Sequence, residues 1–281
     1  MAIIIGDIHG DLAMVEAFLG YKPDAEHIAL GDFIDSRNPE ANLWDELRCL
    51  DRLLKSALDS NTVLLWGNHD LAYTCEQPWK LRLYSHEIFE TRYASAREKG
   101  LLRAAYAVDG WLCTHAGVST ALTRALPDCP WACGDAAVVA DWINSEFDRE
   151  IATPRKRRGL DPEGPFGEGP LFYIGPMRGG HDPFGGIFWR DERWERGNPP
   201  DQRLKQIFGH TKVKSPSRRG NHVNIHIEED NVFWVFDTEV DDFVRLPPKC
   251  DLVELVSRIT PENKHDCADT DFGAPVGREL L

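Results

Sequence analysis

The stretch Ala2-Ile3-Ile4-Ile5-Gly6-Asp7-Ile8-His9-Gly10 decides the fold, because a short apolar run passes directly into a polar motif bounded by glycines. A β-branched run of this length is typical of a buried strand. The arrangement returns twice, where apolar runs end at Gly31-Asp32 and at Gly67-Asn68. Helical patterns separate the three runs, which predicts a β-sheet with helices packed outside it. Polar residues therefore collect at the carboxyl ends of strands, where open α/β sheets bind ligands.

Further strands and helices follow from the same periodicities. The expected strands are 2–5, 27–30, 62–65, 106–108, 111–114, 206–208, 223–227, 232–236 and 243–246. The expected helices are 12–19, 40–58, 78–99 and 135–151. Residues 153–186 are dense in Gly and Pro and open with a basic cluster at 155–158, so we expect a long loop there. One domain is expected over residues 1–256, followed by a flexible tail at 257–281.

Composition and charge exclude several classes of protein. The 281 residues are 42% hydrophobic and 28% charged, which is typical of a globular chain. A net charge of −14 argues against nonspecific binding to a nucleic-acid backbone, because that binding depends on Lys and Arg. The first residues lack the pattern of a secretory signal, and no apolar run approaches the roughly 20 residues of a membrane span. We therefore expect a cytoplasmic protein without a membrane partner. Seven cysteines without a CxxC pair argue against a disulfide framework or a zinc knuckle.

Short motifs rich in metal-ligand residue types recur along the chain, and each of them alone is a weak signal. Together they supply two Asp, one Asn and three His residues at predicted strand ends. The five motifs are Gly6 to Gly10, Gly31 to Asp35, Gly67 to Asp70, Thr114 to Gly117, and Gly209 to Thr211. Imidazole and carboxylate groups suit manganese, iron and zinc, whereas an all-oxygen calcium or magnesium site would not need three histidines. The sequence therefore predicts two divalent transition-metal ions, with manganese as the first choice and iron or zinc as alternatives.

This set of motifs resembles that of the calcineurin-like metallophosphoesterase superfamily. The spacing is most similar to the phosphoprotein phosphatase branch, which includes the bacterial diadenosine tetraphosphatases and phage protein phosphatases. The resemblance extends from about Ile3 to Phe236. It implies an α/β sandwich of two mixed β-sheets flanked by helices, with a dinuclear metal site at the strand-end loops. It also implies a hydrolase of phosphate esters or anhydrides, in which a hydroxide shared between the two metal ions attacks phosphorus.

The resemblance also implies a role for individual residues in holding the metals. The first ion would be held by Asp7, His9 and Asp32, and Asp32 would bridge to the second ion. The ligands implied for the second ion are Asp32, Asn68, His115 and His210. Some branches of the superfamily end with Gly-His-x-His, and the last His serves the first metal. Lys212 stands at that position here, so the resemblance implies one protein ligand fewer for the first ion.

His69 follows the implied ligand Asn68 and matches the general acid that protonates the leaving oxygen in the family. A carboxylate that bonds to this imidazole would orient it and raise its pKa. Asp35 stands at the position of the family's partner acid, and Asp70 is a second candidate.

Three arginines are candidates for binding the substrate phosphate, because a guanidinium group can form two parallel bonds to phosphate oxygens. The family usually reads Gly-Asp-x-x-Asp-Arg-Gly, but here Arg37 is shifted by one place after Asp35-Ser36. Arg190 lies in a segment, Phe188 to Asp191, that resembles the one supplying a second phosphate arginine in the bacterial enzymes. Arg178 is the third candidate.

Three functions remain open at this level, because the motifs do not identify the substrate. The first is hydrolysis of phosphomonoesters, such as phosphoserine or phosphothreonine in proteins. The second is symmetrical hydrolysis of a dinucleoside polyphosphate such as diadenosine tetraphosphate. The third belongs to another class: a protein that binds a phosphorylated ligand without turnover. A pure binder has no need of a general acid, so His69 favours the two enzymatic interpretations.

Overall fold

The first of two central β-sheets contains the strands that end in the first three motifs. In this computed structural model, which describes residues 1–36, 41–59, 61–73, 86–152, 154–157, 160–165, 169–227 and 232–246, its strand order is β13-β12-β1-β2-β3-β4. The strands are β1 (Ala2–Ile5), β2 (Glu26–Ala29), β3 (Thr62–Leu65), β4 (Leu102–Arg103), β12 (Phe233–Asp237) and β13 (Asp242–Leu246). Strands β1 to β4 run parallel to one another, and β12 runs antiparallel to both of its neighbours, β1 and β13. The sheet is therefore mixed, as predicted.

The second sheet contains the strands that precede the last two motifs, in the order β10-β11-β9-β6-β5. Its strands are β5 (Ala105–Val108), β6 (Trp111–Thr114), β9 (Lys205–Phe208), β10 (Ser217–Arg219) and β11 (His222–Asn224). Strands β6, β9 and β11 run parallel, whereas β5 and β10 pair antiparallel at the edges. Strands β5 and β6, both predicted from the sequence, form a hairpin around Asp109-Gly110, and His115 follows the second strand directly.

The two sheets pack face to face, and β1 shows how. Side chains alternate between the faces of a strand, so a strand buried on both sides is apolar throughout. Ala2 and Ile4 belong to a buried cluster with Trp111 and Ile207 of the second sheet. Ile3 and Ile5 belong to the buried cluster that contains the helices. The apolar run that opens the chain is therefore buried on both faces, against the second sheet on one side and against helices on the other.

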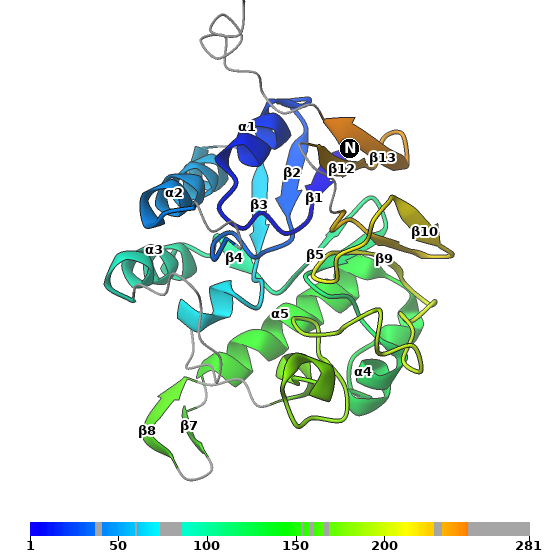
Figure 1. Cartoon of the computed structure of the whole chain (residues 1–281). Helices are drawn as coiled ribbons and strands as arrows, with labels where there is room; N and C mark the ends of the chain where they lie inside the picture. The colour runs from blue at the N-terminus through cyan, green and yellow to red at the C-terminus, as the bar shows by residue number, and fades with distance from the viewer. Residues whose placement is uncertain are drawn as a thin grey trace, which may run out of the picture. The chain divides into compact units, whose positions relative to one another are not determined.

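Helices flank the sheets (Figure 1). They are α1 (Leu12–Gly20), α2 (Leu43–Asp59), α3 (His86–Glu98), α4 (Thr120–Ala125) and α5 (Ala136–Ala152). Helices α1 and α2 pack together beside the first sheet, and α5 packs on β5 and β6. Helix α2 begins at Leu43 and not at residue 40, because the Asn42 side chain accepts hydrogen bonds from the backbone N–H groups of Trp44 (3.0 Å) and Asp45 (3.1 Å). Such a side chain caps a helix and fixes its first turn.

The segment expected to be a long loop contains ordered backbone, so that expectation was wrong in part. Strands β7 (Pro154–Arg157) and β8 (Leu160–Pro165) pair antiparallel. Two 3-10 turns follow, at Pro170–Phe172 and Pro176–Arg178. Pairing between two neighbouring short runs depends on backbone hydrogen bonds and needs no apolar alternation, which is why the sequence pattern did not reveal it.

One compact unit spans Met1–Pro248. The expected boundary near residue 256 and the expected tail lie outside the described residues, and both remain predictions. No helix in the described part of the chain combines the length and the apolarity needed to cross a membrane. The expected cytoplasmic location is a further prediction that nothing in the fold tests.

Candidate metal centre

Ligand atoms from four of the five motifs meet at the carboxyl ends of the parallel strands. Asp7 follows β1, Asp32 follows β2, His115 follows β6 and His210 follows β9. One ligand atom from each of these residues lies within 4.8 Å of the others, and all four side chains are buried. Residues up to 203 positions apart in the sequence therefore form one cluster.

Two glycines allow the loops after β2 and β3 to approach closely. A Cβ atom on Gly31, whose φ is +106°, would lie 2.4 Å from the backbone N of Gly67. A Cβ atom on Gly67 would lie 2.2 Å from the backbone N of Asp32. Only glycine fits at such distances and at such a φ. As a result, the backbone N–H of His69 donates to Asp32 Oδ1 at 2.9 Å, which joins the second and third motifs.

Backbone strain is concentrated at the cluster. Among the described residues, seven other than glycine have a positive φ. Four of the seven are site residues predicted from the sequence: His9 (49°), Asp32 (54°), Asp35 (64°) and His210 (64°). This conformation costs free energy for residues with a Cβ and persists where surrounding contacts enforce it, often at functional sites.

His115 is held so that a lone pair points into the cluster. Its Nδ1 lies 2.8 Å from the carbonyl oxygen of Leu30, which can only accept, so Nδ1 carries the proton and donates. In the neutral ring Nε2 is then an acceptor. This Nε2 lies 2.9 Å from Asn68 Oδ1, 3.1 Å from His210 Nδ1 and 3.5 Å from Asp32 Oδ2. Four potential metal-ligand atoms, one each from His115, Asn68, His210 and Asp32, therefore lie close together.

His9 is oriented in the same way on the other side of Asp32. Its Nδ1 donates to the carbonyl oxygen of Ile34 at 3.1 Å, and its Nε2 lies 3.9 Å from both Asp7 Oδ2 and Asp32 Oδ2. Burial lowers the pKa of His9, which favours the neutral ring. Because Asp32 Oδ2 faces both His9 and His115, this one oxygen stands between two groups of ligand atoms.

His210 completes the group around His115. Its backbone N–H donates to Asp7 Oδ1 at 2.8 Å, and its ring packs edge-on against Trp189 with centroids 5.9 Å apart. Burial first, and then the positive charge of Arg178, hold the pKa of His210 well below its ordinary value. The imidazole is therefore neutral and able to bind a cation.

These residues fit a divalent transition-metal ion. Burying two carboxylates, an amide oxygen and ring nitrogens against one another is unfavourable unless a cation lies between them. Neutral imidazoles whose other nitrogen bonds to a backbone carbonyl are the usual form of histidine metal ligands. Together with two carboxylates and an amide oxygen, they form a donor set suited to manganese, iron or zinc.

His69 and Asp35 form a short pair beside this cluster. His69 Nδ1 donates to Asp35 Oδ2 at 2.6 Å, and His69 Nε2 lies 3.9 Å from Asp32 Oδ2. Burial alone would lower the pKa of His69, but the charge of Asp32 and the bond to Asp35 raise it to about 9. This pKa favours the doubly protonated, cationic ring of His69 at neutral pH, whereas burial favours the neutral ring of His9. The pKa values of these two neighbouring histidines are shifted in opposite directions, which suits His69 to donate a proton and His9 to bind a metal ion.

Asp70 is not the partner of His69. Its carboxylate accepts backbone hydrogen bonds from Asp32 (2.7 Å), Phe33 (3.1 Å) and Gly67 (2.9 Å), and a further bond from the hydroxyl of Tyr93. It thus joins the loops that carry the second and third motifs.

Glu46 of α2 supports the site in a way that the sequence analysis missed. This residue is fully buried and accepts hydrogen bonds from the backbone N–H groups of Asp35 (2.7 Å) and Ser36 (2.9 Å). The sequence holds one signal for it, since Glu46 interrupts the apolar face formed by Leu50 and Leu53 at helical spacing. A buried acid in such a face needs hydrogen-bond donors.

His226 was also missed, because the sequence analysis assigned it only to a strand. It lies just beyond β11, and its Nδ1 is 2.9 Å from Asp7 Oδ2. The available sequence signal was a histidine near the carboxyl end of the predicted strand 223–227, the end at which the other ligand residues lie.

The three predicted phosphate-binding arginines have different surroundings. Arg37 lies outside the described residues. Arg190 is 1% exposed, its guanidinium lies over the ring of Phe208, and its Nε donates to the carbonyl oxygen of Asn198 at 3.4 Å. None of these partners belongs to the cluster. Arg178 pairs with Asp191 at 2.9 Å, and its charge acts on His210.

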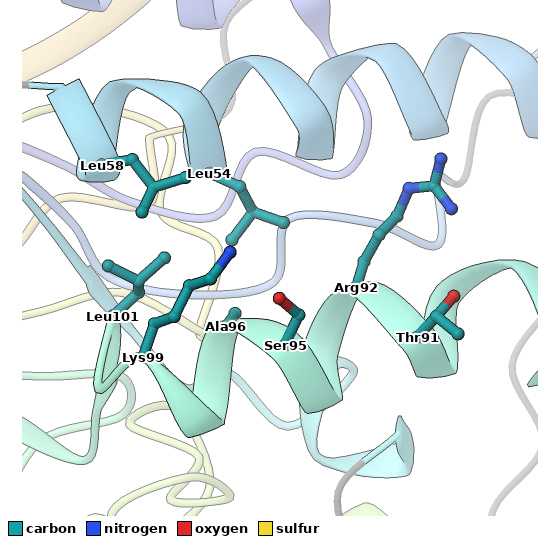
Figure 2. Close-up of a pocket in the computed structure, with 8 residues that line it drawn as sticks. All are labelled: Leu54, Leu58, Thr91, Arg92, Ser95, Ala96, Lys99 and Leu101. Atoms are coloured by element: carbon teal, nitrogen blue, oxygen red, sulfur yellow. The ribbon is translucent and has the colours of Figure 1, made fainter.

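A groove between α2 and α3 is a different feature (Figure 2). Leu54 and Leu58 of α2 face Arg92 of α3 and Lys99, which directly follows that helix, across it. None of its eight lining residues is a His, Asp, Glu or Cys, so the groove offers no metal ligands of those types.

Several solved structures show similarity to this chain. Among solved structures the chain is similar to a metallophosphoesterase from Sphaerobacter thermophilus, with 13% identity, a TM-score of 0.39 and coverage of 88% of this chain and 89% of the other. It is similar to a hypothetical protein from Pyrococcus horikoshii, with 11% identity, a TM-score of 0.42 and 92% coverage of both chains. The phosphoesterase Yfce from E. coli gives 13% identity, a TM-score of 0.34 and coverage of 88% and 99%.

The family described as calcineurin-like phosphoesterase matches residues 2–253, which include every residue of the cluster. The two mixed sheets, the flanking helices and the buried Asp and His residues agree with this match. This chain therefore belongs to the calcineurin-like phosphoesterase family and is a metal-dependent hydrolase of phosphoesters.

Proposed function

We propose that this enzyme is a phosphatase that hydrolyses monoesters of alkyl alcohols, such as phosphoserine or phosphothreonine, and that it belongs to the phosphoprotein phosphatase branch. The observation that carries the proposal is the pair of His69 and Asp35, at 2.6 Å, directly beside the metal-ligand cluster. The branch assignment is supported by Lys212, which stands where other branches carry a second histidine in the last motif.

The proposed metal site divides the cluster into two sets that share Asp32. One set is Asp7, His9 and Asp32, and the other is Asp32, Asn68, His115 and His210. The position of Asp32 Oδ2, 3.9 Å from His9 Nε2 and 3.5 Å from His115 Nε2, supports a bridging role for this oxygen. Two divalent ions bound there would lower the pKa of a shared water and neutralise charge on the phosphoryl oxygens. Manganese is the metal that we propose.

His69 is proposed as the general acid. Asp35 holds the proton-bearing ring through Nδ1, so Nε2 remains directed toward the cluster, and the side chain is 17% exposed. A proton at Nε2 can be transferred to the oxygen of the departing alcohol. An alkoxide is a poor leaving group and needs this proton, whereas the phosphate released from an anhydride needs it less. The presence of a positioned acid therefore favours monoesters over dinucleoside polyphosphates.

Arg178 is the better supported of the phosphate-binding candidates. Asp191, which is 2% exposed, fixes the guanidinium at 2.9 Å, and the side chain of Arg178 is 19% exposed. Its charge reaches His210 at the edge of the cluster. A guanidinium fixed in this way can bind the phosphoryl group as it approaches.

The test is a substrate panel on protein stripped with a chelator and reloaded with manganese. The panel contains phosphoserine and phosphothreonine peptides, para-nitrophenyl phosphate and diadenosine tetraphosphate. We expect turnover of the peptides, and none in the chelated protein. Preferential cleavage of diadenosine tetraphosphate would replace the proposed substrate class by the alternative one. Binding of phosphopeptide without turnover of any substrate would refute the proposed catalysis.

A further inference from the structure

The side chain of His226 lies against Asp7, on the side of the cluster where the sequence implies one metal ligand fewer. Its Nδ1 is 2.9 Å from Asp7 Oδ2, and its ring centroid is 6.2 Å from that of His9. The side chain is 11% exposed. His226 therefore reaches the same carboxylate oxygen as His9 Nε2, from another strand.

Strand register explains why His226 is there. Strands β11 and β9 run parallel, and Asn224 pairs with Phe208. Continuing both chains by two residues places His226 level with His210, at the edge of the sheet where the cluster forms. The backbone is fixed, because the N–H of His226 donates to Asn224 Oδ1 (3.0 Å) and its carbonyl oxygen accepts from Val213 N–H (2.9 Å).

Gly6 provides the space for this approach. A Cβ atom on Gly6 would lie 3.3 Å from the Cα of His226, which is tighter than ordinary contact. The glycine at the end of β1 thus allows the chain after β11 to lie directly beside Asp7.

The contact with Asp7 has the features of two ligands that share a cation. Asp7 Oδ1 already accepts from the backbone N–H of His210. Nδ1 of His226 is buried, and no described atom lies in hydrogen-bonding geometry to it, although Asp7 Oδ2 is within ion-pair distance. Nδ1 of His226 and Oδ2 of Asp7 are close without meeting hydrogen-bond geometry, so both atoms can bind a third atom.

We propose that His226 is a ligand of the first metal ion, which it binds through Nδ1 together with Asp7 and His9. In this chain a histidine just beyond β11 would bind the metal ion that the last histidine of Gly-His-x-His binds in other branches. No metal ligand is then required at Lys212. The inference rests on the two-metal site of the proposed function. A simple ion pair between His226 and Asp7 is the rival account.

The two accounts predict different behaviour of His226→Ala and His226→Phe. The phenylalanine variant keeps a ring of similar size and loses both nitrogens. If His226 is a ligand, each variant binds the weaker of two Mn²⁺ ions at least about tenfold less tightly, since even the supporting partners of metal ligands contribute that much. If His226 only pairs with Asp7, the variants lower the melting temperature of the metal-free protein and leave Mn²⁺ binding unchanged.

The experiment is a calorimetric Mn²⁺ titration of the metal-free full-length chain, with bound metal counted by elemental analysis. Electron paramagnetic resonance of the loaded protein gives an independent reading, because a coupled pair of Mn²⁺ ions and a single Mn²⁺ ion have different spectra. His222→Ala is the matched control, since His222 lies on β11, four residues before His226. Its Nδ1 contacts Gln202, its ring lies by Phe208, and neither partner belongs to the cluster.

We expect two Mn²⁺ ions in the wild type and in the control, and a one-ion spectrum in both His226 variants at Mn²⁺ concentrations that load the wild type. Two ions bound with unchanged affinity in either His226 variant would overturn the inference and leave the proposed function intact. Fewer than two ions in the wild type would overturn the proposed metal site as well, so the two failures are distinguishable. Should the alanine variant not fold, the phenylalanine variant decides.

Discussion

Replacing His69 by Asn removes the proton donor and keeps a polar side chain of similar reach. In the metal-free protein the charge of Asp32 and the bond to Asp35 raise the pKa of the ring to about 9, which favours the protonated form at pH 7. A positioned general acid contributes about 10²- to 10⁴-fold to the rate. The expected loss for an alkyl phosphate is therefore about 3–5 kcal/mol of transition-state stabilisation.

The leaving group provides the assay. We compare kcat of wild type and His69→Asn on a phosphoserine peptide and on para-nitrophenyl phosphate, both with saturating manganese. Nitrophenolate leaves readily without a proton, so the loss on that substrate should be at least about tenfold smaller than on the peptide. His222→Asn serves as the control, because the contacts of His222 with Gln202 and Phe208 lie outside the cluster.

Equal losses on both substrates would contradict the assignment of His69 as the acid, because a purely structural defect does not distinguish leaving groups. Unchanged turnover of the peptide would contradict it as well. The manganese content of both variants must match that of the wild type, because a change at His69 could disturb the neighbouring metal ligand Asn68.

Four further predictions follow from the contacts of the site. Asp35→Asn keeps an acceptor for His69 and removes the charge that raises its pKa, so the high-pH limb of kcat against pH should move to lower pH. In the chelated protein, protonated His69 contributes fully to the free energy of unfolding below about pH 6.5, and this contribution is lost as pH rises through about 9. The difference in urea-unfolding free energy between wild type and His69→Asn should therefore shrink over that range. Glu46→Gln leaves one of two backbone donors without an acceptor and should lower unfolding free energy by about 1–3 kcal/mol, measured by urea titration. Asp70→Asn should weaken Mn²⁺ binding, measured by calorimetry, because it loosens the backbone of Asp32; unchanged affinity would contradict this anchoring role.

The sequence by itself determined the fold class and the identity of the cluster. Local patterns carry this information, because the alternation of burial along a strand and the residue types at its end are written in consecutive residues. The apolar run Ala2–Ile5 and its return before Gly31 and Gly67 were sufficient to predict a sheet with polar groups at its strand ends. The resemblance of the five motifs to a known family implied the sandwich and the set of Asp7, Asp32, His115 and His210.

Only the tertiary structure decided which side chains support the cluster. Asp35 rather than Asp70 meets His69, because Asp70 is occupied by the backbone of two loops. Glu46 reaches Asp35 from a helix, and His226 reaches Asp7 through the register between β9 and β11. Helix packing and strand register depend on contacts between residues far apart in the chain, so no local pattern encodes them.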